Sequence, residues 1–384
     1  MPAPTDDRRL RALVASHVPV TDSRPSKQIR WLESAGYQVD VLSRGDAHPA
    51  ATGRHVAIGF PPLVARMAAY ALLPDRARFR FMIDSQIPAD LVPQADAKYD
   101  VVVVHDLELL PWFVEHAAEL TDGPIVLDLH EFFGSQGIGF TYRVLFARYH
   151  RWLLGFVADP VFTVRTTVAD GIADLYVSTL GIPRPTVIRN TPPFADLQPS
   201  DRHDNRILLV HHGRADLGRG LELMLDAVLQ LDPRFVLVLM LVGDDRELAY
   251  FRRHSAVAAG RVEFRDPVAV DDVPAALNDC DLEIIFFPPK TENLRFVLPN
   301  KLFEAIQGRL GLVIGESVEM VKVVEGAGNG IVVSGWTADA LALSIASLDL
   351  HAVQTFKAGS HAVAHQYSAE HERSTFLALI GSAA

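Results

Sequence analysis

The sequence predicts an α/β protein built from two Rossmann-like domains that face one another across a cleft. Short apolar runs such as residues 100–105 (DVVVVH) have the length and composition of strands that are covered on both faces. Segments with helical periodicity separate these runs, so the strands are expected to pair in parallel through helical crossovers. Two such series flank a stretch rich in Pro and Asp at residues 191–205, and a length of 384 residues suits two domains.

The first series begins with a strand–helix–strand unit. A strand is predicted at residues 10–16, a helix at residues 26–35 that stops at Gly36, and a strand at residues 37–42. Residues 10–42 together have the length of a single βαβ unit with parallel strands. The pattern recurs with a helix through Ala118 and strands at residues 100–105, 124–129, 160–164 and 186–189.

The second series follows the Pro- and Asp-rich linker. Strands are predicted at residues 207–211, 235–242, 262–264, 282–286, 312–314 and 330–333, and helices at residues 221–230, 246–257, 273–277 and 301–307. The expected division is a first domain at residues 1–194, a second at residues 195–365, and a C-terminal helix at residues 366–384 that packs back toward the first.

Composition and charge exclude several classes of protein. A net charge of −11 argues against general nucleic-acid binding, and Cys280, the single cysteine, has no partner for an intrachain disulfide. Residues 1–11 are polar and lack the apolar core of a secretory signal, and charged residues or prolines interrupt every apolar stretch before 18 residues. We therefore expect a cytoplasmic protein without a spanning helix.

Two segments mix apolar bulk with arginine, at residues 61–82 and 142–156. Two interpretations stay open. The segments either form a basic amphipathic surface that rests on the inner face of a membrane and reaches a lipid-linked acceptor, or they are helices packed on the first sheet with solvated arginines.

Three groups of residues carry candidate chemistry, and the first follows the opening strand of the second domain. Gly213, Arg214, Arg219 and Gly220 precede a predicted helix that starts at Leu221. Small residues let the backbone approach an anion, and a helix N-terminus with forked arginine donors suits a diphosphate. The alternative is a flexible loop with two solvated arginines.

The second group is the string LPNKLFE at residues 298–304. Asn300 is expected to cap a helix on which Lys301 and Glu304 share one face, offering a cation for phosphate beside a carboxylate for ribose hydroxyls. The alternative is a capped helix with an ion pair between these two side chains.

The third group ends the third apolar strand of the first domain with Asp128, His130 and Glu131. A histidine at a strand end can bond a sugar hydroxyl or a developing charge. It can equally bond a neighbouring carboxylate as local structure, which is also the interpretation favoured for the pair His105-Asp106.

Taken in this order, the three groups resemble the retaining glycosyltransferases of family 4, which have the GT-B architecture, and the resemblance extends over residues 10–345. Further matching strings are LVG at residues 241–243, DCD at residues 279–281 and VIRN at residues 187–190. In that family a Gly-Arg pair and a later Lys-Gly pair hold the donor diphosphate. Here these are Gly213-Arg214 and Arg219-Gly220, with Arg in place of Lys.

The resemblance implies roles for individual residues. His130, Arg214 and Arg219 are the expected catalytic residues, and Glu304 is expected to bind ribose. The expected donor site comprises Gly213, Arg214, Arg219, Asn293, Asn300, Lys301 and Glu304, with Val268 and Phe287 near the nucleobase. The family often has a second glutamate eight residues before the first, where this chain has Phe296. The carboxylate expected near the donor sugar is therefore either missing or supplied by Glu292.

The function that follows is transfer of a sugar from a nucleotide-diphosphate donor to a hydroxyl acceptor, with retention. The acceptor is a glycan, a lipid-linked molecule or a small molecule, as in polysaccharide biosynthesis. No cofactor or metal is expected, because no Cys, His or Asp string has ligand spacing. Two alternatives stay open: a sugar-nucleotide 2-epimerase of the same architecture, and a non-catalytic protein that binds nucleotide sugars.

Overall fold

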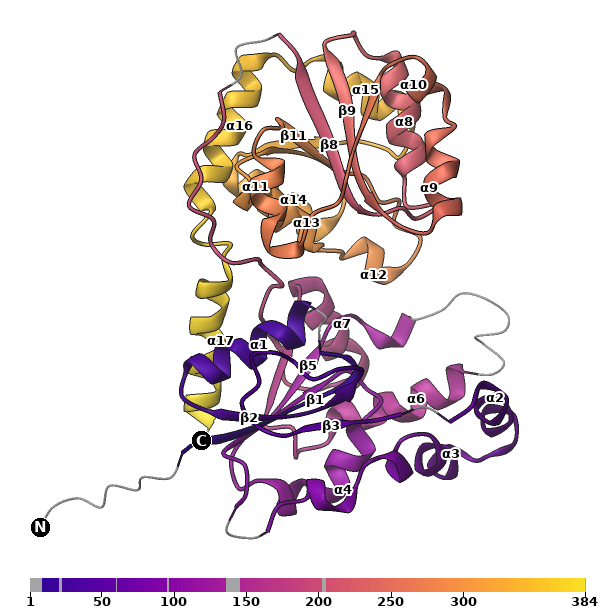
Figure 1. The fold of residues 1–384 in the computed structure, drawn as a ribbon, viewed down its shortest axis with the longest axis vertical. Coiled ribbons are helices and arrows are strands. Elements are labelled where there is room, and N and C mark those ends of the chain that lie inside the picture. The colour runs from indigo at the N-terminus through magenta and orange to yellow at the C-terminus, as the bar shows by residue number, and fades with distance from the viewer. Residues whose placement is uncertain are drawn as a thin grey trace, which may run out of the picture. The chain divides into compact units, whose positions relative to one another are not determined.

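The computed structural model describes residues 9–20, 23–59, 61–94, 97–135, 146–201 and 205–383. The chain forms two compact units, one of Met1–Arg189 with Arg373–Ala384 and one of Asn190–Glu372. Residues 142–145 of the second basic segment, which include Arg143, lie outside the described residues. Figure 1 colours both units along the chain.

The first unit is a parallel sheet of the order β3-β2-β1-β4-β5-β6-β7. Its strands are β1 (Arg11–Pro19), β2 (Gln38–Arg44), β3 (His55–Ala57), β4 (Val101–His105), β5 (Ile125–Leu129), β6 (Val164–Thr167) and β7 (Thr186–Val187). Every residue of β4 and β5 is buried, as expected for central strands covered on both faces. Because all pairs are parallel, the carboxyl ends of β1, β4 and β5 share one edge.

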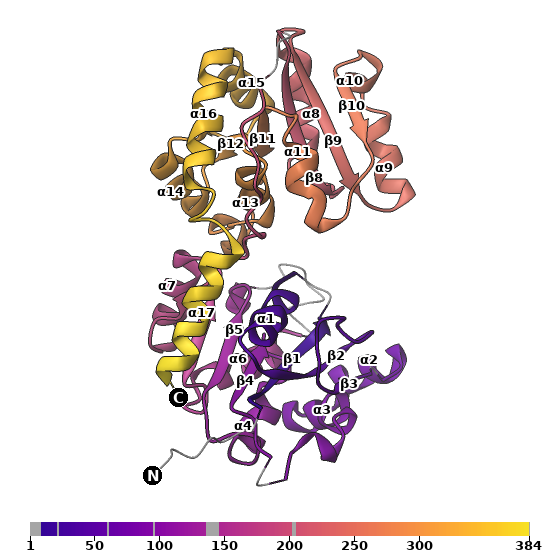
Figure 2. The same cartoon turned by 60° about the vertical axis from the view of Figure 1, so that its left-hand side comes forward.

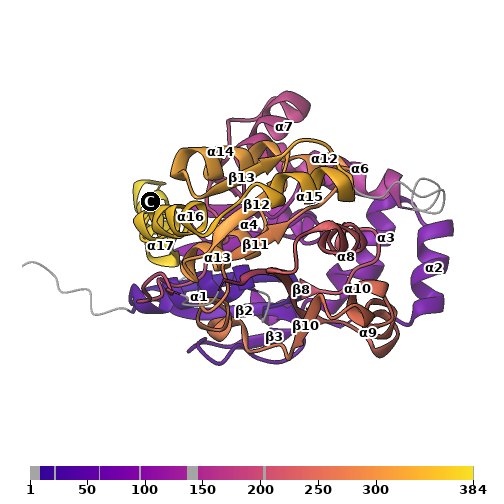
Figure 3. The same ribbon diagram turned by 90° about the horizontal axis from the view of Figure 1, so that it is seen from above.

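The helices of the first unit connect its strands, and α17 comes from the end of the chain. They are α1 (Ser23–Ser34), α2 (Leu63–Leu72), α3 (Asp75–Met82), α4 (Leu110–Leu120), α6 (Ala147–Gly155), α7 (Asp170–Leu180) and, from Arg373 onward, α17 (Ala369–Ala383). The Phe376 ring of α17 lies 5.7 Å from the Trp31 ring of α1, so the end of the chain packs on this unit. Figures 1 and 3 both draw α2 at the periphery of the unit, beside α3.

The second unit is a parallel sheet of the order β10-β9-β8-β11-β12-β13. Its strands are β8 (Ile207–Arg214), β9 (Phe235–Val242), β10 (Val262–Arg265), β11 (Leu282–Ile285), β12 (Gly311–Gly315) and β13 (Gly330–Val333). Its helices are α8 (Leu221–Gln230), α9 (Asp245–Arg252), α10 (Ser255–Ala258), α11 (Val273–Leu277), α12 (Glu292–Arg295), α13 (Asn300–Gln307), α14 (Val318–Ala327), α15 (Ala338–Ala346) and α16 (Leu350–Val363). Separate apolar cores cover the two faces of the sheet, one under α8 and α15, the other under α13 and α14. Figure 2 labels these four helices.

The two-series α/β prediction is confirmed, and three element predictions need correction. The strand expected at residues 160–164 is wrong: Pro160 lies in a turn in which Asp159 accepts a hydrogen bond from the Val161 amide at 3.0 Å, and β6 starts only at Val164. The helix expected at residues 246–257 is two helices, because His254 caps α10 by accepting from the Ala256 amide. The strand expected at residues 186–189 is limited to β7 (Thr186–Val187).

Among the helices within the described ranges, none combines the length and the hydropathy needed to cross a bilayer.

Candidate functional site

A glycine-rich loop follows β8 at the carboxyl edge of the second sheet. Gly213, Gly218 and Gly220 have φ values of 105°, 85° and 88°, which side-chain-bearing residues rarely adopt. Helix α8 starts directly after Gly220, so the loop presents backbone amides at a helix N-terminus of the kind that binds anions. A Cβ atom at Gly213 would lie 3.3 Å from the Lys301 amine, which places this cation against the loop.

Gly220 offers a test of how closely this loop is packed. A Cβ atom there would lie 2.0 Å from the Phe286 carbonyl oxygen, so Gly220→Ala combines a backbone clash with left-handed strain and is expected to cost about 2–3 kcal/mol of unfolding free energy. Gly218→Ala is the matched control, because its φ is similar and its Cβ would meet only the amine at the end of the long Lys290 side chain, at 3.3 Å. Urea unfolding that finds equal losses for the two variants would contradict this account.

His212 is the centre of a buried polar network below the loop. Its Nδ1 lies 3.1 Å from Glu283 Oε2 and its Nε2 lies 2.8 Å from Glu304 Oε2. Burial alone lowers the pKa of His212, but the two carboxylates outweigh burial and raise the pKa to about 9. An imidazolium at neutral pH therefore holds the Glu304 carboxylate in place.

Lys301 of α13 contacts the same end of β8. Its amine donates to the His212 carbonyl oxygen at 2.7 Å and lies 3.4 Å from His211 Nε2. His211 Nδ1 lies 2.8 Å from the Ile284 carbonyl oxygen, so Nδ1 carries the proton and Nε2 accepts from Lys301. Burial lowers the pKa of Lys301 to about 8, against the opposing pull of Glu283 and Glu304, and Arg219 lowers it further.

The structure thus brings four of the predicted donor-site residues to one edge: Gly213, Arg219, Lys301 and Glu304. Arg214 is exposed at the end of β8, and Arg219 pairs with Asp216 at 2.8 Å while remaining largely exposed. A cation, a carboxylate and a glycine-rich backbone in one place suit a ligand with a phosphate group beside hydroxyl groups.

Other predicted residues are placed differently from the expectation. Asn300 does not cap α13: Pro299 holds the cap position, and Asn300 Oδ1 accepts from Asn190 Nδ2 at 2.8 Å. Glu292 lies 3.7 Å from Arg295 within α12, which also carries Asn293. The structure pairs Glu304 with His212, whereas the sequence suggested Lys301 as its alternative partner.

The two nucleobase-region residues differ in accessibility. Val268 is exposed in the loop after β10. Phe287 is buried, with its ring 5.1 Å below the Lys301 amine and 6.3 Å from the His211 ring, so little of its face is open to a base.

Sequence reasoning missed three residues of this site. Glu283 is hidden inside the apolar strand β11, where a lone charge was itself the signal of a buried partner. His212, directly before Gly213, was assigned no role. Lys290, whose amine donates to the Gly218 carbonyl oxygen at 3.0 Å, adds a further cation and follows two prolines after β11.

In the first unit, His130 is held at the end of β5 by neighbouring side chains. His130 Nε2 lies 2.9 Å from His105 Nδ1, and His130 Nδ1 lies 3.6 Å from Asp106 Oδ2. Asp106 has a positive φ of 61°, and its Oδ1 accepts from the His130 amide at 3.3 Å. Burial lowers the pKa of His105 to about 3 and raises the pKa of Asp106 to about 8.

His105, Asp128 and His130 also form a group whose ligand atoms lie close enough to hold a metal ion, which the sequence did not suggest. The guanidinium of Arg24, however, donates to both oxygens of Asp128 at 2.6 Å, and Gln28 and Thr166 donate to them as well. A fixed positive charge on the central carboxylate opposes a cation at the same place. The geometry is that of a hydrogen-bonded network.

The chain thus consists of two parallel α/β units, and in the second a glycine-rich loop lies beside a lysine and a carboxylate. Two family models match in succession: residues 23–191 match a glycosyl transferase 4-like domain, and residues 206–349 match the glycosyl transferases group 1. The chain belongs to the group 1 glycosyltransferases and is a glycosyltransferase enzyme.

Solved structures agree with this fold at low sequence identity. Anabaena HepE in complex with UDP and glucose is 14% identical, with a TM-score of 0.69 over 97% of this chain and 100% of its own. Sucrose-phosphate synthase from Thermosynechococcus elongatus is 14% identical, with a TM-score of 0.68 over 98% and 99%. A glycosyltransferase from Rickettsia africae is 13% identical, with a TM-score of 0.67 over 98% of both chains. These likenesses establish the GT-B fold, while no curated protein matches the sequence.

Proposed function

We propose that the protein transfers a glycosyl group from a nucleotide-diphosphate sugar to a hydroxyl acceptor with retention of anomeric configuration. The bond between the anomeric carbon and the diphosphate breaks, and a bond from that carbon to the acceptor oxygen forms on the same face. The acceptor proton passes to the departing diphosphate. Arg214, Arg219 and Lys301 stabilise the diphosphate as its charge develops, and Glu304 binds the ribose.

The observation that carries this proposal is the placement of Lys301 and Glu304 one turn apart on α13, against the loop at Gly213. The amine and the carboxylate are fixed by contacts to His212, so neither has to be ordered when a ligand binds. Anabaena HepE, which shares the fold, is described in complexes with UDP and with UDP-glucose, which supports a nucleotide-sugar donor here.

We further propose that transfer needs no metal ion. Arginine and lysine side chains surround the loop, and Lys290 adds another beside Gly218, so protein cations are available to balance the diphosphate charge. Turnover that is unchanged by EDTA is the expected result, and loss of turnover that added magnesium restores would contradict it.

A thermal-shift screen over the glucose conjugates of UDP, GDP, ADP and dTDP tests the donor class. A ligand at one hundred times its Kd stabilises the folded protein by about 2.7 kcal/mol, so the true donor stands out by mass action. We expect one of the four to raise the Tm of wild-type protein and to raise it less in Glu304→Gln. Stabilisation without turnover would indicate a non-catalytic binding protein, and an epimerised sugar from donor alone would indicate a 2-epimerase.

Donor affinity is expected to fall as pH rises through 8. The Lys301 amine is charged below its lowered pKa of about 8 and neutral above it, so a rise from pH 7 to pH 9 removes most of its charge. The resulting loss of affinity for UDP is about tenfold, measured by isothermal titration calorimetry. Lys301→Arg keeps the charge over this range and should flatten the profile, whereas an equally steep profile in that variant would assign the titration to another group, such as His212.

A further inference from the structure

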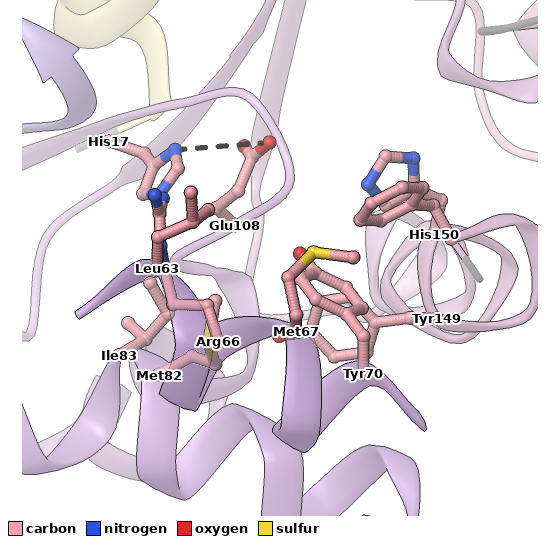
Figure 4. A pocket seen from close by; sticks show the side chains of 11 residues that line it. His17, Leu63, Arg66, Met67, Tyr70, Met82, Ile83, Glu108, Tyr149 and His150 are labelled. Atoms are coloured by element: carbon pink, nitrogen blue, oxygen red, sulfur yellow. Dashed lines mark ion pairs between the residues drawn. The ribbon is translucent and has the colours of Figure 1, made fainter. Parts of the chain in front are cut away.

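A cavity of about 270 Å³ opens at the carboxyl edge of the first sheet, near the ends of β1 and β4. His17 of β1 and Glu108, three residues after β4, form its polar side, and Arg66 of α2 and His150 of α6 also line it. Helices α2, α3 and α6 supply the remaining walls (Figure 4). The carboxyl edge of a parallel sheet is where open α/β folds bind their ligands.

The polar side of the cavity holds a histidine that is neutral at physiological pH. His17 Nδ1 lies 3.9 Å from Glu108 Oε1, and Arg44 hydrogen-bonds His17 Nε2. Burial, with help from Arg44, lowers the pKa of His17 to about 3. Burial raises the pKa of Glu108 to about 7, so this carboxyl group can accept a hydrogen bond from a hydroxyl group when ionised.

The opposite side of the cavity is apolar and aromatic. The Tyr70 and Tyr149 rings lie 5.8 Å apart in an edge-to-face arrangement, and Met67 lies beside them in Figure 4. Arg78 of α3 holds the two tyrosines of this wall in place. Its buried guanidinium donates to three carbonyl oxygens at the end of α2 and packs against both tyrosine rings.

The mouth of the cavity is made by an unusual face of α2. Leu63 and Met67 line the cavity and are nevertheless 64% and 39% exposed. Every exposed position of α2 is apolar: Leu63, Val64, Met67, Ala68, Ala71 and Leu72. A solvent-facing helix surface is normally polar, and a continuous apolar face marks a binding surface.

We propose that this cavity binds the apolar chain of an amphipathic acceptor, whose hydroxyl group faces Glu108 and His17. The proposal rests on the proposed function and assigns its acceptor a chemical class. Cavities that enclose drug-sized ligands are usually larger, roughly 300–1,000 Å³. The cavity therefore encloses only the first part of a chain, and the remainder passes over Leu63 and Met67 at the mouth.

Alkyl β-D-glucosides with ethyl, butyl, hexyl and octyl chains are suitable probes below their micellar concentrations. Binding to the full chain is measured by isothermal titration calorimetry without any donor. We expect the affinity to rise about fourfold for each methylene group that enters the cavity, and to level off at the longer chains. An affinity that does not depend on chain length would overturn the proposal.

Variants of α2 test whether the glucoside binds in the cavity or on the exposed helix surface. Met67→Asp places a charge at the mouth and is expected to weaken octyl glucoside binding at least tenfold, whereas Met67→Leu keeps it. Leu72→Asp is the matched control, because Leu72 is on the same helix and 80% exposed but does not line the cavity. Equal losses in Met67→Asp and Leu72→Asp would refute the cavity as the binding site.

Two further measurements test whether α2 docks on a membrane and whether the proposed glycosyl transfer takes place. If the protein sediments with vesicles of phosphatidylcholine and phosphatidylglycerol, but glucoside affinity is independent of chain length, α2 docks on membranes and the acceptor proposal is wrong. Chain-dependent binding without transfer from any donor would refute the proposed function while leaving the ligand class of the cavity intact. Transfer that is equally fast to ethyl and octyl glucoside would refute the cavity assignment alone.

Discussion

Replacement of Arg24 by methionine is expected to lower the unfolding free energy of the first unit by about 3–5 kcal/mol. Arg24 and Asp128 are almost completely buried, and the guanidinium donates to both carboxylate oxygens at 2.6 Å. Methionine fills a similar volume but leaves the carboxylate with only its neutral donors, Gln28 and Thr166. An unpaired buried charge is far more costly than the loss of the pair itself.

The measurement is urea unfolding at pH 7 in a Trp336→Phe background. The chain has four tryptophans, and the remaining three, Trp31, Trp112 and Trp152, lie in the first unit, so their fluorescence follows that unit alone. Arg76→Met is the control, because the pair Arg76–Glu115 is largely exposed and contributes less than about 1 kcal/mol. Similar losses of unfolding free energy in Arg24→Met and Arg76→Met would contradict the view that burial makes the Arg24–Asp128 pair important for stability.

The same pair predicts a pH dependence. Burial by itself raises the pKa of Asp128, but Arg24 outweighs burial and holds the pKa below its usual range. A depressed carboxyl pKa stabilises the folded state fully above the unfolded-state pKa of about 4 and loses that effect as pH falls below it. In Arg24→Met, burial instead raises the pKa of Asp128 above its unfolded-state value, so the variant loses stability as pH rises. The difference in stability between wild type and Arg24→Met should therefore shrink as pH falls from 7 to 4, and should shrink further below pH 4.

The sequence was sufficient for the fold because burial on both faces leaves a local pattern. The runs at β4 and β5 are apolar without interruption, and the residues between them have helical periodicity, so both could be identified without knowing any contact. The correction at residues 160–164 has a local cause as well. Val161 and Phe162 are apolar enough for a strand, but the turn closed by Asp159 delays β6 to Val164.

The polar networks could not be predicted because they depend on the register between distant strands. Glu283 reaches His212 only because β11 pairs with β8 so that Glu283 lies opposite Val210. Glu304 then approaches the same histidine from α13, 92 residues further along the chain. His105 and His130 meet in the same way, through the pairing of β4 with β5.

The cavity in the first unit was hidden for another reason. Its walls come from α2, α3 and α6, which lie outside the regular strand–helix repeat, and their arrangement depends on the buried Arg78. In the sequence Arg78 is one of several arginines among apolar residues, and nothing separates it from the solvated Arg76 and Arg80. Only the hydrogen bonds to α2 reveal that it is structural.

Replacement of Arg214 by alanine is expected to reduce turnover by about 10²–10³-fold. Arg214 ends β8 beside the glycine-rich loop, and its side chain is exposed, so its removal should leave the fold intact and the Tm nearly unchanged. The loss should appear mainly in kcat, because the charge on the diphosphate increases as the glycosidic bond breaks. Release of nucleoside diphosphate from the donor identified by thermal shift is the readout.

Two variants make this result specific. Arg214→Lys keeps the charge but not the forked pair of donors, so it should recover only part of the rate. Arg206→Ala removes an exposed arginine at the amino end of the same strand, where Arg206 contacts Glu263, and should leave the rate unchanged. If Arg214→Ala turns over like wild type, the leaving diphosphate is stabilised elsewhere, and the half-buried Lys301, fixed by the His212 carbonyl oxygen, becomes the principal cation of the site.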